Sequence, residues 1–378
     1  MRMRIIEEMK EAVKEISYEG YFYKLSEVVE ILILGLLCQN KTLTEIHMWA
    51  TSKQVKPMLQ EKLGIKYIPC YSHLCNLVGM IDSNELNRMF MDFFGKLVKT
   101  VVGKTIAIDG KTVCATANMK NFSEALHIVS AFVVENGITI GQLAVDEKRN
   151  EIPAVQELVR LLNIEGSTVV ADALNCQKKT AKEILKAGAD YVFSVKKNHK
   201  NLHKDIAEMI EFKQSDKVES RVAPLETITK TEKGHGRIEK RTALVTHEVE
   251  WLENRDKWAG LKTIGAIKTP SETRYYISSR KLTAAELLKL TRQEWAVEAM
   301  HWQLDVIFDE DNSTLHEKNT QITINILRKT VLNVVKTYRD NFMPKLNMVN
   351  VMRKCLLDTD FLLDVILGFD SCFDNVTN

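Results

Sequence analysis

The spacing of apolar residues divides the chain into a helical first quarter and a mixed remainder. Apolar positions recur at helical intervals in three early segments, which predicts helices at 24–38, 42–50 and 82–101. Asp82 followed by Glu85 resembles a capping box at the start of the third segment. Few side chains in this quarter suit catalysis. We expect an all-helical N-terminal domain over residues 1–98, used for packing, DNA contact or self-association.

From about residue 104 the apolar period changes. Three β-rich runs separated by turn residues predict strands joined by hairpins at 104–110, 127–137 and 138–146. Helical and extended patterns then alternate, predicting a helix at 151–164, a strand at 167–173, a helix at 178–188 and a strand at 191–197. This alternation is typical of an α/β sheet whose later strands are connected by helical crossovers.

The last part of the chain interrupts this alternation and then returns to helices. A second β-rich block is predicted at about 205–272, and residues 273–279 look like a strand that rejoins the sheet. One helical stretch follows from Thr283 to 311, and the tail at 320–378 is mostly helical. Because 378 residues exceed most single cores, we expect an α/β domain at 99–319 between the N-terminal helices and a helical C-terminal tail.

Composition adds little to this picture. The chain is 45% hydrophobic and 27% charged, as in ordinary globular proteins, and its net charge of +2 neither requires nor excludes a nucleic-acid partner. Seven cysteines without a CxxC pair indicate free thiols instead of a disulfide framework or a zinc site. The N-terminus lacks a signal-peptide pattern, and the most apolar stretch, 28–38, is shorter than the ~20 residues that span a bilayer. We expect a soluble, cytoplasmic protein with no membrane partner.

Two aspartates stand at the ends of short apolar runs. Asp109 lies in AIDGKT and Asp172 in VVADALNCQKK, so each is predicted to leave a buried strand. A carboxylate in that position is normally paired or binds a metal ion. The plainer alternative is an aspartate satisfied by backbone amides at a strand-to-turn junction. Gly110 is expected to form a sharp turn that lets Asp109 face a cleft.

A third acid comes from the predicted helix near residue 300. Four positions would share one face of that helix: Glu294, Glu298, Trp302 and Asp305. A solvated polar face is one interpretation, but the neighbouring tryptophans are unusual for a plain wet surface. Glu298 is central and is the candidate ligand, with Glu294 and Asp305 as second choices. Two strand-end aspartates and a helix glutamate can hold two divalent cations for phosphodiester chemistry.

Two basic segments suggest a nucleic-acid partner. A run of lysines extends from Lys178 to Lys204 and includes Lys196, Lys197 and Lys200. Lysines there could neutralise phosphates and give salt-dependent binding, although a solvated helix face followed by a loop fits equally well. In GHGRIEKR (234–241), the glycines allow close backbone approach and His235 and Arg237 supply donors. A β-turn with charged flanks is the alternative there.

Several short motifs occur in a fixed order: AIDGKT, HIVSAF, VDEKRNEIPAV, ADALNCQK, GHGRIEKR, TRYYIS and WAVEAMHWQLDVIFDED. Together they resemble the DDE transposases of bacterial insertion sequences, specifically the family that includes the H-repeat-associated proteins. The resemblance covers nearly the whole chain. It implies a ribonuclease-H-like catalytic core, interrupted by a β-rich insertion before the final acidic helix, with helical segments on either side.

The resemblance also implies roles for individual residues. By motif position, Asp109, Asp172 and Glu298 would be the catalytic acids and would hold two Mg²⁺ ions, for which Mn²⁺ could substitute. DNA-binding residues would be Lys196, Lys197, Lys200, His235, Arg237 and Arg292, with Trp295 stacking on an unpaired base or packing in the core. Relatives usually place a histidine where this chain has Glu294. This extra carboxylate could weaken a DNA contact, replace a ligand, or mark a loss of activity.

The implied function is binding of the element's terminal inverted repeats, followed by metal-dependent DNA cleavage and strand transfer. Pairing two ends implies at least a homodimer on DNA, in a protein that is nucleoid-associated when bound. Two alternatives stay open: an inactive remnant that still binds DNA, and a related metal-dependent nuclease with another substrate.

Overall fold

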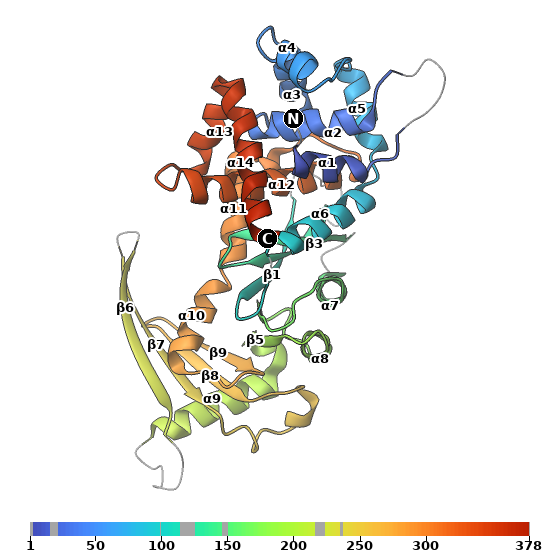
Figure 1. Cartoon of the computed structure of the whole chain (residues 1–378). Helices are drawn as coiled ribbons and strands as arrows, with labels where there is room; N and C mark the ends of the chain where they lie inside the picture. The colour runs from blue at the N-terminus through green and yellow to red at the C-terminus, as the bar shows by residue number, and fades with distance from the viewer. Residues whose placement is uncertain are drawn as a thin grey trace.

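The computed structural model describes residues 3–15, 22–98, 100–113, 125–145, 150–215, 224–234 and 237–377. It is a mixed α/β protein in which a large sheet is flanked by helices and capped at one end by a helical region (Figure 1). The strands are β1 (Thr105–Thr112), β2 (His127–Val133), β3 (Ile138–Val145), β4 (Thr168–Ala171), β5 (Asp190–Val195), β6 (Glu226–Gly234), β7 (Arg237–Thr246), β8 (Thr263–Lys268) and β9 (Thr273–Ser278).

Helices lie before, within and after the sheet along the chain. Those before the sheet are α1 (Arg4–Glu11), α2 (Leu25–Leu37), α3 (Leu43–Ala50), α4 (Val55–Pro57), which continues as a π-helical turn (Met58–Lys62), α5 (Tyr71–Met80) and α6 (Ser83–Leu97). Within and beside the sheet lie α7 (Glu151–Leu161), α8 (Lys178–Lys186), α9 (Lys200–Gln214), α10 (Ala284–Gln293) and α11 (Ala296–Phe308). The tail contains α12 (Lys318–Phe342), α13 (Met348–Leu357) and α14 (Thr359–Thr377).

The nine strands form one sheet in the order β3-β2-β1-β4-β5-β9-β8-β7-β6. β3, β2 and β1 are antiparallel neighbours, as hairpins require, whereas β4 and β5 lie parallel to β1. The parallel strands are connected through α7 and α8, so the predicted alternation of strands and helices is confirmed. The remaining strands are antiparallel and extend the same sheet, and β9 rejoins it beside β5 as predicted.

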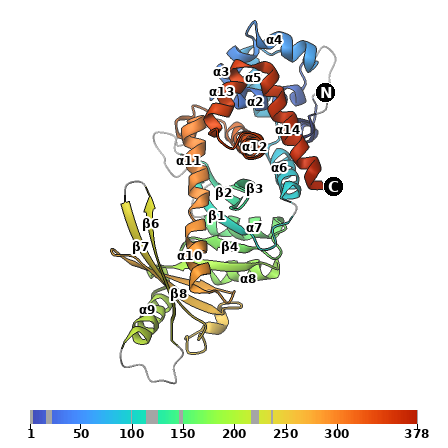
Figure 2. The same cartoon turned by 60° about the vertical axis from the view of Figure 1, so that its left-hand side comes forward.

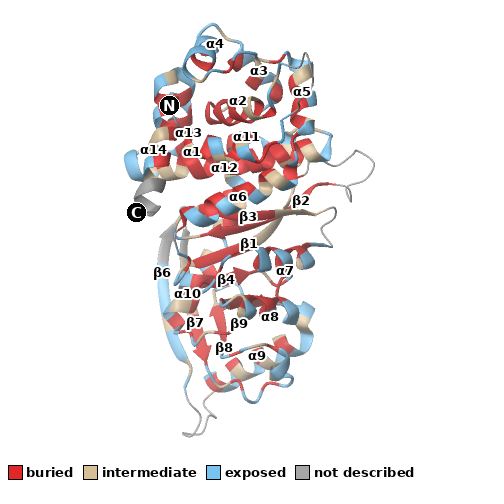
Figure 3. Ribbon diagram, turned by 45° about the vertical axis from the view of Figure 1, so that its right-hand side comes forward, coloured by how far each residue is buried: buried red, intermediate tan, exposed pale blue. Residues whose placement is uncertain are grey.

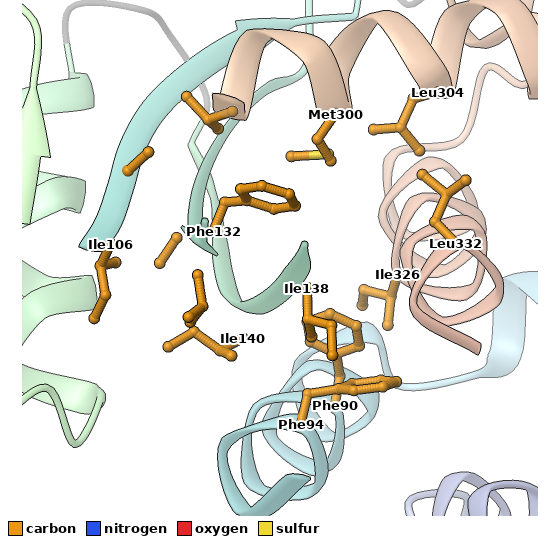
Figure 4. Packing of buried hydrophobic residues seen from close by; sticks show 14 of the residues in the cluster. Phe90, Phe94, Ile106, Phe132, Ile138, Ile140, Met300, Leu304, Ile326 and Leu332 are labelled. Carbon is orange, nitrogen blue, oxygen red and sulfur yellow. The ribbon is translucent and has the colours of Figure 1, made fainter. Parts of the chain in front are cut away.

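Apolar residues on both faces of the sheet pack against helices. Figure 4 shows Phe132 of β2 beside Met300 of α11, and Ile138 of β3 beside Phe90 of α6 and Ile326 of α12, all in one cluster. Burial is concentrated in β1–β4 and in the helix faces that cover them (Figure 3). This packing fixes α11 above β1, which places the acidic helix over the strand that carries Asp109.

The helices from the two ends of the chain pack together at one end of the sheet (Figure 2). α12 lies against α2, α6 and α14. The Asp370 carboxylate of α14 accepts hydrogen bonds from the backbone N–H groups of Arg4 and Ile5 at the start of α1. No helix in the described part of the chain has both the length and the apolar character needed to cross a membrane.

Three expectations about the elements need correction. Residues 200–214 form α9 instead of β structure, because Leu202, Ile206 and Ile210 recur every four residues and are all buried. Asp82 does cap α6, but no reciprocal capping box forms and the Glu85 side chain pairs with Arg88. The stretch from Thr283 to 311 is two helices with a break at 294–295, so α11 begins only after that break.

Candidate active site

Parallel pairing of β1 with β4 brings the two aspartates together. The register pairs Ile108 with Ala171, and the next residue on each strand is Asp109 or Asp172. Neighbouring strands lie about 4.8 Å apart, so both carboxylates project from one edge of the sheet. Asp172 leaves its strand as predicted.

The expected turn at Gly110 is wrong, because β1 continues to Thr112 and Gly110 pairs with Val129 of β2. Asp109 therefore lies within β1, at the point where its parallel neighbour ends. Gly110 serves a different purpose. A Cβ atom there would lie 2.4 Å from Nε2 of His127 and 2.6 Å from Oε2 of Glu151, so a hydrogen in place of a side chain lets β1 pass over that pair.

Glu298 lies in the first turn of α11 and is exposed. One turn later on the same helix, Nδ1 of His301 lies 3.7 Å from Oδ2 of Asp109. Burial is the main cause that raises the pKa of Asp109 to about 7. The nearby carboxylates of Glu151, Asp172 and Glu298 raise this pKa further, whereas the hydrogen bond from the Gly110 N–H lowers it. Asp172 and Glu298 are thus both close enough to Asp109 to disfavour the charge of Asp109.

Glu294 is a further carboxylate at the same place. It is the C-cap residue of α10, the first residue of the break between α10 and α11, and is partly buried. Burial raises the pKa of Glu294 to about 8; the charges of Asp172 and Glu298 add to the shift, while Lys196 and Arg274 oppose it. The residue that departs from the family pattern therefore faces the catalytic candidates instead of solvent alone.

A largely buried chain of hydrogen bonds connects Asp172 to Glu151 and His127. The backbone N–H and the side-chain amide of Asn175 both donate to Oδ1 of Asp172, each at 3.1 Å. The same amide donates to Oε1 of Glu151 at 2.8 Å, and Oε2 of Glu151 pairs with Nε2 of His127 at 2.8 Å. Nδ1 of His127 meets the Thr112 hydroxyl at 2.9 Å. This chain connects the strand that carries Asp109 to the loop that carries Asp172.

Sequence reasoning did not single out Asn175, Glu151 or His127. One signal was available: an Asn three residues after a strand-end Asp can fold its amide back onto that carboxylate in an Asx-type turn. Nothing comparable identifies Glu151, which opens α7 within a polar segment. Its burial to 3% exposure becomes evident only when α7 packs against β2 and β3.

The predicted DNA-binding residues surround this edge of the sheet in part. Lys196, Lys197 and Lys200 are exposed where β5 ends and α9 begins. Arg292 is exposed on α10, with Nη2 lying 3.8 Å from Oε2 of Glu239. Trp295 is 49% exposed, and the Arg274 guanidinium lies 5.5 Å from the centre of its ring.

The GHGR segment is only partly visible. His235 lies outside the described residues. Arg237 begins β7 and pairs with Gly234 in the backbone ladder, but its side chain is outside the described part of the structure. Within the described part, no three His, Cys, Asp or Glu side chains stand close enough together to hold a metal ion in this arrangement.

The match to known proteins covers the strands and helices that build this site. The transposase DDE domain matches residues 102–334, which include Asp109, Asp172 and Glu298. The chain belongs to this family. It is also related to the H-repeat-associated proteins, as the motifs predicted: Escherichia coli (strain K12) YbfL and the H repeat-associated protein YhhI are each 31% identical over 315 residues, covering 80% of this chain and 81% of theirs.

Among solved structures, the piggyBac transposase in a synaptic complex with hairpin DNA matches 99% of this chain and 82% of its own, at 12% identity and a TM-score of 0.46.

Proposed function

We propose that this transposase binds the terminal inverted repeats of its insertion sequence and catalyses metal-dependent DNA cleavage and strand transfer. One observation carries the proposal: Asp109 and Asp172 are neighbours at the edge of the parallel strands, with Glu298 and Glu294 on the helices above them. The order β3-β2-β1-β4-β5, with only the first three strands antiparallel, supports a ribonuclease-H-like core that the other strands extend.

Divalent cations fit the donor set. Asp109, Asp172 and Glu298 offer only carboxylate oxygens, the ligands that Mg²⁺ and Mn²⁺ prefer. The raised pKa of Asp109, caused by burial and then by neighbouring carboxylates, indicates a local deficit of positive charge. When bound, two such ions would activate the attacking hydroxyl and stabilise the leaving oxygen of the phosphodiester.

The protein's own residues supply orientation and binding. Asn175 holds the Asp172 carboxylate in one rotamer through two donors. The exposed lysines at the β5 exit would contact DNA phosphates next to the acids. Trp295, held under the Arg274 guanidinium, presents an open ring face on which a base could stack. Joining two element ends would require at least two copies of the chain on DNA.

The decisive experiment is strand cleavage of a duplex that carries the element's own terminal repeat, with Mg²⁺ or Mn²⁺. Wild type should cut only with metal, and Asp172→Asn should abolish cutting. Asp190→Asn is the matched control, because Asp190 opens β5 at the opposite end of the parallel strands and should leave cutting intact. Cutting by Asp172→Asn would refute the assignment of this residue.

A second candidate function is an inactive remnant that recognises the ends without cutting them. Glu294 favours this candidate, because it places a carboxyl group next to Asp172 and Glu298 where the resemblance implies a histidine. Specific binding by wild type without cleavage, together with cleavage restored by Glu294→His, would support the remnant. Wild-type cleavage would exclude it.

A further inference from the structure

Lys111 is a buried cation two residues after Asp109 on β1. Because side chains alternate along a strand, Lys111 and Asp109 point to the same face of the sheet, toward α11. The Lys111 side chain is 12% exposed and pairs with Asp305 of α11. Its ammonium also lies 3.2 Å from Oε2 of Glu310 and 3.5 Å from Oδ1 of Asp311. Such a charge is retained in a protein interior only when it is paired.

Two contacts fix α11 lengthwise along β1. His301 meets Asp109, and Asp305 meets Lys111. The helix residues are four apart, a rise of about 6 Å, and the strand residues are two apart, a rise of about 6.6 Å. Both contacts can therefore form at once in a single register. Glu298 lies three residues before His301, so its height above Asp109 is set by the same register.

Glu310, one of the carboxylates beside Lys111, also contacts the helical region. Glu310, in the short 3₁₀ turn after α11, is 1% exposed. Its Oε1 accepts a hydrogen bond from Nδ2 of Asn325 at 2.8 Å and lies 3.5 Å from Nη1 of Arg328, both on α12. Lys111 thus joins the strand of Asp109 to the end of α11 and, through Glu310, to α12.

We propose that Lys111 is a positioning residue that holds α11 in register on β1, thereby fixes the position of Glu298 relative to Asp109, and through that position raises the affinity of these acids for a divalent cation. The part of this inference that concerns the cation rests on the proposed function. Lys111 itself cannot be a ligand, because a protonated ammonium has no lone pair. It acts through the position of Glu298.

Lys111→Met, compared with a matched buried lysine, tests the inference in the full-length protein. Lys213 on α9 pairs with Glu248 at 2.6 Å and has a fully buried side chain, so Lys213→Met removes an equivalent charge at a distance from the acids. Two quantities are measured without DNA: amide hydrogen exchange over 296–308, and Mn²⁺ affinity by electron paramagnetic resonance of the free ion. Lys111→Met should accelerate exchange in α11 and weaken Mn²⁺ binding at least about tenfold, within the range found for groups that orient metal ligands.

The controls separate positioning from general loss of stability. Lys213→Met should accelerate exchange in α9 and keep Mn²⁺ affinity within about twofold of wild type, and Lys111→Arg should recover most of the lost affinity because it restores the cation. Unchanged α11 exchange in Lys111→Met, or an equal loss of Mn²⁺ affinity in Lys213→Met, overturns the inference. If wild type binds no Mn²⁺, the proposed metal-dependent function fails, while α11 exchange still decides whether Lys111 fixes the helix.

Discussion

At the scale of single residues, the site is electrostatically unfavourable without a cation. Burial and neighbouring carboxylates raise the pKa of Asp109 to about 7 and that of Glu294 to about 8. A protein core selected only for stability would replace such groups with apolar or amide side chains. Their presence at one edge of the sheet is the behaviour expected of a site shaped for a ligand.

Asp109→Asn should stabilise the metal-free protein at alkaline pH. The pKa of Asp109 is raised by burial from 3.8 to about 7, so its protonated form stabilises the fold below pH ~4 and this contribution is lost as the pH rises through about 7. Asparagine never ionises. We expect the variant to gain on the order of 3–4 kcal/mol in free energy of unfolding at pH 8 and only about 1 kcal/mol at pH 4.5, measured by denaturant unfolding in EDTA. The exposed Asp256→Asn is the control, and an equal effect of Asp109→Asn at both pH values would contradict the argument.

Asn175→Leu should lower both the free energy of unfolding and the Mn²⁺ affinity, because Asn175 orients the Asp172 carboxylate. The substitution removes donors to two carboxylates, so we expect a loss of about 1–3 kcal/mol in free energy of unfolding and a fall of roughly 10–100-fold in Mn²⁺ affinity. Asn333→Leu is the matched control, because Asn333 is buried on α12 and bonds only the Thr139 backbone. It should cost similar stability and leave Mn²⁺ affinity unchanged. Equal affinities in the two variants would show that Asn175 does not orient Asp172.

At this scale, the sequence identifies residues whose polarity conflicts with a local apolar pattern. Asp172 follows three buried residues, so its position was predictable. Lys111 and Glu151 each follow polar neighbours, and their burial depends on contacts with segments distant in the chain: Lys111 with Asp305 of α11, and Glu151 with His127 of β2. Local patterning contains no information about such contacts, so these two residues could not be found from it.

At the scale of elements, periodicity predicted most strands and helices but not their joints. The missed α9 has a clear four-residue repeat that its position after a lysine-rich loop obscured. The helix break at 294–295 contains no proline or glycine that would mark it in the sequence. Both residues also keep helical backbone angles. The position of this break could not be read from the sequence.

Gly110→Ala tests how closely β1 lies on the Glu151–His127 pair. The added methyl would come within 3 Å of both side chains, and we expect a loss of about 1–3 kcal/mol in free energy of unfolding through the forced displacement of buried groups. Gly95→Ala is the control, because Gly95 lies within α6 with open space around it, and alanine there should stabilise by up to about 1 kcal/mol. Thermal or urea unfolding of both variants measures the contrast. A neutral Gly110→Ala would mean that β1 is not tightly packed at this point.

At the scale of the whole molecule, basic groups come from several separate elements. The β6–β7 hairpin stands beside α10 (Figure 2), and a cleft of about 320 Å³ is lined in part by Lys230, Lys289 and Arg292. The exposed lysines at the β5 exit follow the strand that pairs with β4, next to the end of the strand that leads into Asp172. A chain with a net charge of only +2 can therefore present separate local positive surfaces.

Neutralising Lys196, Lys197 and Lys200 together with glutamine should weaken binding of terminal-repeat DNA and flatten its salt dependence. Each phosphate contact contributes about 0.9 to the slope of log affinity against log salt, so loss of three contacts should reduce the slope by up to about 2.7. Replacing Lys345, Arg353 and Lys354, exposed residues at α13 and the loop before it, removes the same charge from the opposite end of the molecule and should leave the slope unchanged. Fluorescence anisotropy measures both slopes from DNA affinities at salt concentrations of roughly 50 to 300 mM, where counterion release controls binding. If the two triple variants lower the slope equally, the effect is one of net charge, and the β5 exit is not the surface that holds the DNA.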